Sequence, residues 1–209
     1  MTSPTTSATA NNSSAMLPAE QHSSAIRSFL DERSRDETRL RLATEADAAF
    51  LLGLRLDSSL NKNISHTSSD LGEQRAWMRS YEARHAAGRE AYFVIEVAGV
   101  PEGSIRLYDY LPKSDSFCWG SWIIRPGAPM ATAFQSVMIV YDLGFGPLGF
   151  ARAHFDVRQA NISVWKFHEK MGVTMVREDA ADRFYEYPAE NYKIARTWLK
   201  KFTQMRDTR

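Results

Sequence analysis

The side chains best suited to proton transfer lie on one face of an expected strand. Residues 151–158 (ARAHFDVR) alternate apolar and polar side chains, which predicts a strand with two unlike faces. His154 and Asp156 share the polar face with two arginines. Such a face belongs either to an edge strand covered by salt bridges or to a strand that lines a water-filled cleft. In a cleft, Asp156 and His154 would point at a substrate, and both groups can move protons.

A second stretch is suited to binding a negative charge. Residues 117–124 read as a strand, a turn with Pro126, Gly127 and Pro129 follows, and apolar residues then recur at helical spacing. Pro129 suits the first helical position. The first N–H groups of a helix lack helical partners and attract anions, and glycine lets the backbone approach a ligand. The turn therefore predicts a phosphate site, with a plain strand-to-helix connection as the alternative. The candidate backbone donors are Gly127, Ala128, Met130, Ala131 and Thr132.

Composition narrows the classes of function. The chain has 209 residues and a net charge of +1, so no broad field favours nucleic acid or a membrane surface. A single cysteine, Cys118, excludes an internal disulfide and a multi-cysteine zinc site, and it suits a reducing compartment. The five histidines show no metal-ligand spacing. With no membrane-spanning run or signal peptide in view, we expect a cytoplasmic protein without metal, nucleic-acid or membrane partners.

The elements that would position these groups fit one domain. Residues 1–37, rich in Ser, Thr, Ala and Asn, are expected to form a disordered or weakly ordered tail, with a short helix as an option over residues 25–37, and residues 38–209 the domain. Arg55, on the helix expected at 45–58, either is solvated or reaches into a cleft. The expected strands are 39–43, 90–97, 103–110, 117–124, 151–158, 174–178 and 183–187, and the further helices are 71–87, 129–145, 161–171 and 188–202.

This order of elements resembles the GNAT superfamily of N-acetyltransferases. The strongest match is FDVRQANISVWKFHEKMGV, which is similar to the family's strand followed by an asparagine-led helix. RLATEADAAFLLGLR is similar to the opening strand and helix, and the resemblance covers residues 39–187. It implies an α/β (α+β) fold, a single GNAT-like domain whose mixed, mostly antiparallel central sheet of about seven strands is flanked by helices.

The resemblance also implies the donor site. Acetyl-CoA would be the co-substrate, with direct transfer of its acetyl group to a primary amine. The backbone of Ile123 and Ile124 would line the pantetheine arm, and an N–H near Ile124 would stabilise the oxyanion. Asn161 would hydrogen-bond the arm, and Lys170 would meet the adenosine phosphates.

Two positions depart from the family pattern. The family's phosphate loop usually begins with glutamine or arginine and carries two glycines or a glycine and an alanine. Here the run is RPGAPMA, so Arg125, Gly127 and Ala131 would serve, and Pro129 removes one backbone donor. His168 stands where the family usually has a tyrosine that protonates the leaving thiolate. Histidine can also donate a proton, so we expect His168 as the general acid and Asp156 as the base, against the alternative of an exposed helical histidine.

The acceptor is expected to be a small-molecule amine. His66, which is otherwise a surface histidine of a polar loop, would line the acceptor cleft with Arg106, Tyr108, Trp119 and His154. Aromatic rings and an arginine suit an anionic molecule, such as an amino sugar or a nucleotide-linked amino sugar. The alternatives are a protein N-terminus as acceptor, or a non-catalytic domain that binds acyl-CoA. Either a monomer or a homodimer fits the sequence.

Overall fold

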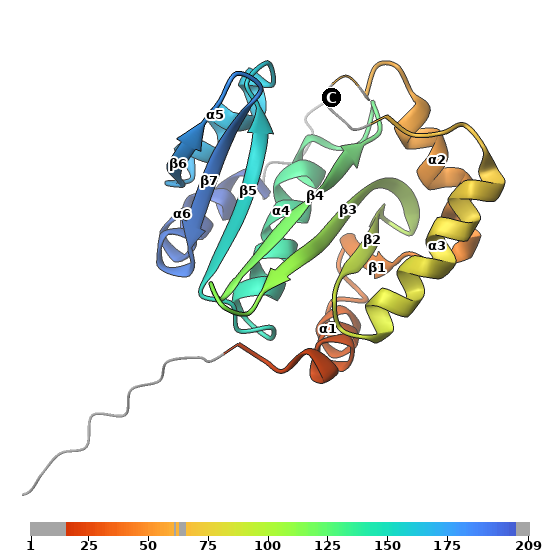
Figure 1. Ribbon diagram of the computed structural model, residues 1–209, viewed down its shortest axis with the longest axis horizontal. Helices are drawn as coiled ribbons and strands as arrows, with labels where there is room; N and C mark the ends of the chain where they lie inside the picture. Colours follow the sequence, from red (N-terminus) through yellow and green to blue (C-terminus); the bar gives the residue numbers. More distant parts are fainter. Residues whose placement is uncertain (1–15, 61, 63–65, 204–209) are drawn as a thin grey trace, which may run out of the picture.

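The protein folds around one seven-stranded sheet with the strand order β1-β2-β3-β4-β5-β7-β6. The computed structural model describes residues 16–60, 62 and 66–203. Neighbouring strands pair antiparallel, except that β4 and β5 run parallel. The expectation of a mostly antiparallel sheet of about seven strands, flanked by helices, is confirmed (Figure 1).

The elements alternate along the chain as the sequence predicts, with shifts of a few residues at their ends. The strands are β1 (Thr38–Leu42), β2 (Ala91–Val97), β3 (Val100–Leu111), β4 (Ser116–Ile124), β5 (Arg152–Arg158), β6 (Thr174–Glu178) and β7 (Asp182–Pro188). The helices are α1 (Ala19–Glu32), the 3-10 turn η1 (Glu45–Asp47), α2 (Ala48–Leu56), α3 (Leu71–Ala86), α4 (Met130–Phe145), α5 (Ile162–Lys170) and α6 (Ala189–Thr203).

Strand β2 is buried on both faces, which explains the run of five apolar and aromatic residues, 91–95, with which it begins. Phe93 and Ile95 belong to the main core, which also contains buried side chains of α1, α4 and α6. Tyr92 and Val94 belong to a second cluster formed with α2 and α3. Because successive side chains of a strand point to opposite faces, the two clusters lie on opposite sides of the sheet.

Helix α1 lies within the segment that the sequence assigns to a weakly ordered tail, so this expectation is corrected for residues 19–32. The helix buries Ile26 and Phe29 in the main core. The buried His22 holds the first turn of α1 in place. One of its ring nitrogens contacts the carbonyl oxygen of Leu17 (2.6 Å), and the other contacts the carbonyl oxygen of Gly88 (2.9 Å). Residues 1–15 of the expected tail lie outside the described residues.

The parallel pair β4–β5 separates soon after it starts. Within the described chain the two strands pair only at Ser116 with Arg152 and at Phe117 with Ala153. Beyond these pairs the strands diverge, with α4 behind the opening (Figure 1). The remaining edge of β4 is therefore available to a ligand that enters between the strands.

A bulge in β4 lies at this opening. Between the pairs Ser104–Ile123 and Arg106–Gly120, β4 contains one residue more than β3. Ser121, inside the bulge, adopts a φ of 48°, which is uncommon for a residue other than glycine. A bulge bends a strand and turns its side chains and backbone groups, so it helps to move the end of β4 away from β5.

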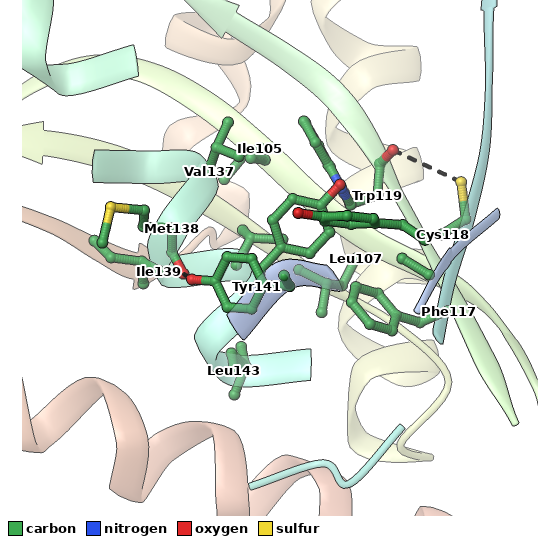
Figure 2. Packing of buried hydrophobic residues seen from close by; sticks show 14 of the residues in the cluster. Ile105, Leu107, Phe117, Cys118, Trp119, Val137, Met138, Ile139, Tyr141 and Leu143 are labelled. Atoms are coloured by element: carbon green, nitrogen blue, oxygen red, sulfur yellow. Dashed lines mark hydrogen bonds between the residues drawn. The ribbon is translucent and has the colours of Figure 1, made fainter. Parts of the chain in front are cut away.

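Aromatic packing fixes β4 against α4. Phe117 contacts Tyr141 and Phe145, and Trp119 meets the Tyr141 ring edge-to-face at 5.6 Å between centroids (Figure 2). Gly144 permits the close approach, because a Cβ there would overlap the Phe117 ring. The helix that starts at the opening is thus held rigidly behind the strand that borders it.

Candidate active site

The opening between β4 and β5 continues into a cleft of about 890 Å³. Its walls come from the diverging parts of the two strands, from β3, from α3 and the segment before it, and from the first turns of α4 and α5. Eight side chains singled out in the sequence line this one cleft, although they span about a hundred residues of the chain: His66, Arg106, Tyr108, Trp119, Ile124, Asp156, Asn161 and His168.

Arg106 lies in the half of the cleft bordered by α3 and β3, which we call the acceptor half. Its guanidinium carbon lies 5.2 Å from the centroid of the Trp77 ring and 4.8 Å from that of Tyr108. Its Nε donates a hydrogen bond to Oε2 of the buried Glu90 (2.6 Å). The arginine that the sequence assigns to an anionic substrate is thus framed by two aromatic rings and held by a carboxylate that the sequence analysis did not identify.

Asp156 lies on the β5 wall of the cleft, whereas Arg106 lies on the β3 wall, where it pairs with Gly120 in the middle of β4. The Asp156 side chain is exposed and makes no hydrogen bond or ion pair with any described residue. Burial raises the pKa of the nearby Cys118 thiol to about 12, and the Asp156 carboxylate adds to this rise. Asp156 is therefore an exposed carboxyl group on the cleft wall, whereas the buried thiol of Cys118 stays protonated.

His168 is buried at the bottom of the cleft rather than exposed on its helix. Its ring packs against Phe155 (4.4 Å between centroids), Trp119 (5.5 Å) and Phe167 (5.5 Å). Burial among these rings lowers the pKa of His168 to about 3, so the imidazole is neutral near pH 7. Its Nδ1 is buried and has no hydrogen-bond partner in the described chain.

The turn between β4 and α4 borders the other half of the cleft, which we call the donor half. Gly127 has a φ of 92° and open space around it, as expected for a residue that lets a ligand approach. Pro129 is the residue before the helix and not its first residue, so α4 begins at Met130. Thr132, in the first turn, is fully buried, and its hydroxyl has no hydrogen-bond partner among the described residues.

Asn161 and Trp122 complete the donor half. Asn161 precedes α5, but its side chain makes no capping hydrogen bond, so its amide is left to face the cleft that it lines. Trp122 also lines the cleft, and its indole Nε1 donates to the Ser136 hydroxyl on α4 (3.2 Å).

His154 does not join the cleft, although it shares a strand face with Asp156. One ring nitrogen contacts the Ser116 hydroxyl (2.9 Å), and the other lies 3.0 Å from a carboxylate oxygen of Asp109. Asp109 reaches it from a bulge in β3, where its φ is 52°. The expected second base is therefore engaged in a separate cluster at the edge of the cleft.

Other predicted residues lie beside the cleft and not in its lining. Ile123 is buried, while Arg125 and Met130 are exposed on the turn. Lys170 is exposed near the end of α5, away from the described lining. Besides Lys170, the predicted donor residues that are not part of the lining are Ile123, Arg125, Gly127, Ala128, Met130, Ala131 and Thr132.

Several lining residues were missed in the sequence. Trp77 has the spacing of a core residue, and Gln74 and Cys118 have no signal of their own. Arg158 could have been found, because it shares the polar strand face with Asp156. Of the two possibilities considered for Arg55, the structure agrees with the one that places it in a cleft. Arg55 lines the cleft wall, and its Nε donates a hydrogen bond to the Thr67 hydroxyl (2.6 Å).

The sheet thus opens between its two parallel strands, with the start of a helix and a lined cleft at the opening. The chain belongs to the GNAT acetyltransferase family, because the model of the acetyltransferase (GNAT) domain matches residues 37–174. It is thus an N-acetyltransferase of a family that takes the acetyl group from acetyl-CoA.

Two solved structures resemble this chain, one at the level of the family and the other at the level of the fold alone. FdhC, described as a nucleotide-linked sugar GNAT and solved in its apo form, is 38% identical, with a TM-score of 0.73; the match covers 80% of this chain and 96% of FdhC. A dodecameric spermidine N-acetyltransferase from Vibrio cholerae is 17% identical, with a TM-score of 0.60; this match covers 76% of the chain and 97% of that protein, and it shows the fold alone. A search of curated proteins finds no match.

Two further features concern the described residues only. None of their helices combines the length and the apolar character that crossing a bilayer requires. They also contain no group of three or more His, Cys, Asp and Glu side chains placed to hold a metal ion.

Proposed function

We propose that the protein transfers the acetyl group of acetyl-CoA to the primary amine of an anionic small molecule, and specifically of a nucleotide-linked amino sugar. The observation that carries this proposal is the pair of opposite charges across the acceptor half. Arg106 lies on the β3 wall beside two aromatic rings, and Asp156, on the β5 wall, makes no ion pair with any residue that the structure describes. Such a cleft fits a molecule with an anionic group at one end and an ammonium group at the other.

The donor half fits an acyl-CoA. A pantetheine arm needs polar backbone groups along its length, and the diverging edge of β4 offers them next to the amide of Asn161. The N–H groups of Met130 and Ala131, at the start of α4, and the flexible backbone at Gly127 suit a pyrophosphate. The thioester then supplies the acyl carbon, and a backbone N–H near Ile124 would stabilise its oxygen during attack.

Asp156 would accept the proton that the acceptor ammonium must lose before it can attack, directly or through water. His168 would not act as the general acid that the family resemblance implies for its position. Because its imidazole is neutral, it can donate one hydrogen bond toward the donor half, but it does not carry the extra proton of a charged general acid. The leaving thiolate would then take its proton from solvent or from the proton released by the amine.

The test is release of free CoA from acetyl-CoA with a panel of amines: nucleotide-linked amino sugars, the free amino sugars, spermidine and N-terminal peptides. We expect turnover with nucleotide-linked amino sugars, and an Asp156→Asn variant that loses about 100-fold or more in kcat while it still binds acetyl-CoA. Turnover with peptides alone would contradict the proposal and favour a protein acceptor. Binding of acetyl-CoA without turnover on any amine would favour a binding domain.

A further inference from the structure

The acceptor half contains a charged cluster of Arg84, Glu90 and Arg106, of which the proposed function uses Arg106 alone. Glu90, just before β2, is almost completely buried, with its side chain 3% exposed. Arg84 of α3 donates from Nε to one of its carboxylate oxygens, and Arg106 of β3 contacts the other oxygen through both Nε and Nη2. A buried carboxylate is stable only with such partners, so Glu90 ties both arginines to the cleft wall.

The geometry leaves one edge of Arg106 for a ligand. Glu90 occupies Nε and Nη2, and Nη1 makes no hydrogen bond within the described part of the chain. The guanidinium plane is confined between Trp77 and Tyr108, so this remaining edge has a fixed direction. A planar guanidinium in a fixed orientation is suited to bind phosphate oxygens.

The cluster also has a charge excess. Arg84 and Arg106 bring two positive charges and Glu90 one negative charge, which leaves +1 beside the cleft. Without Arg84 the pair of Glu90 and Arg106 would be neutral. The guanidinium of Arg84 also lies 5.3 Å from the Trp77 ring, so its charge acts on the same aromatic wall.

A second cation lies on the wall of the same cleft. Arg55 of α2 lines it together with Arg106, and its Nε donates a hydrogen bond to the Thr67 hydroxyl (2.6 Å). Two cations on the wall of one cleft fit a diphosphate better than a single carboxylate, because a diphosphate carries more negative charge.

We propose that Arg84, Glu90 and Arg106 form one unit that binds a diphosphate group of the acceptor. Glu90 is the positioning residue that orients Arg106, and Arg84 makes the unit net positive. The unit would fix the direction of the acceptor in the cleft, with its phosphates at the β3 wall and its amine at Asp156. This inference rests on the proposed function in that it places the acceptor in this half of the cleft.

The experiment is calorimetric titration of the full chain with uridine diphosphate in the presence of saturating CoA. The CoA occupies the donor half, so the probe reports on the acceptor half. We expect Arg84→Met to weaken binding about tenfold at low ionic strength and less at high salt, because it removes one nearby charge. Arg79→Met is the matched control: Arg79 also lies on α3, but it pairs with Glu45 at the surface (2.6 Å) and should leave binding unchanged.

A second variant separates positioning from charge. Glu90→Gln keeps the shape of the side chain and adds a net positive charge, so pure electrostatics predicts tighter binding. If Glu90 positions Arg106, binding becomes weaker instead, and in turnover the acceptor KM rises more than kcat falls. Circular dichroism checks that the variant folds, and the Arg84 titration decides the matter if it does not.

The inference is overturned if Arg84→Met binds the probe as wild type does, if Arg79→Met weakens binding equally, or if Glu90→Gln binds more tightly. Acetyl transfer plays no part in the titration. A failed amine panel together with probe binding that depends on Arg84 would therefore contradict the proposed function and leave this inference standing.

Discussion

Replacing His168 with phenylalanine should make the stability of the protein less dependent on pH. Burial lowers the pKa of His168 to about 3 in the folded chain, against about 6.5 for an exposed histidine. Between these values the unfolded chain binds more protons than the folded chain, so stability falls as the pH falls. The loss attributable to His168 begins below about pH 6.5 and reaches about 2 kcal/mol at about pH 5.

Urea unfolding of wild type and His168→Phe at about pH 7.5 and about pH 5 measures this difference. The variant should lose about 2 kcal/mol less than wild type between the two conditions, because other titrating groups contribute equally to both chains. Met171→Leu is the control, since Met171 is buried nearby and does not titrate. Equal losses in wild type and His168→Phe would refute a neutral buried imidazole, and they would restore the charged general acid as a possibility.

Two further changes test the structure around the site. Gly88→Ala should lower the free energy of unfolding by about 2 kcal/mol more than Gly99→Ala, as measured by urea unfolding. Both glycines have a positive φ, but only at Gly88 would a Cβ overlap the carbonyl oxygen of Ala19. Equal effects of the two substitutions would argue against the docking of α1. Arg196→Met should lower the free energy of unfolding by about 1 to 2 kcal/mol at neutral pH, because Arg196 donates two hydrogen bonds to Asp142 (2.6 and 2.7 Å) that join α6 to α4. An unchanged midpoint of urea unfolding would contradict this role.

Much of the fold could be predicted from the sequence because its signals are local. The alternation of residues 151–158, the glycine turn near Gly127 and the hairpin after Thr174 each specify an element, and their order resembles one family. The sequence did not show where the tail ends and α1 begins. This helix is stabilised by Ile26 and Phe29 in a core that forms only in the folded chain.

The candidate site could be predicted only in part, because only some of its features follow from residues close together in the sequence. Residue types identified Asp156 and Arg106, and the family resemblance identified His168; the structure brings all three into one cleft. Partners distant in the sequence decided the rest: a bulge turns Asp109 toward His154, and the buried Glu90 engages Arg106. The burial of His168 was also invisible in its own helix, because its covering rings include Trp119 and Phe155 from two different strands.

The central claim is that the cleft acetylates the amine of a diphosphate-linked acceptor. The most direct measurement compares kcat/KM for a nucleotide-linked amino sugar with kcat/KM for the same amino sugar free of its nucleotide, with acetyl-CoA saturating. We expect a preference of about 100-fold or more for the nucleotide-linked form, since two charge-assisted contacts are lost with the phosphates. Equal values for the two sugars, or a higher value for spermidine or a peptide, would contradict it.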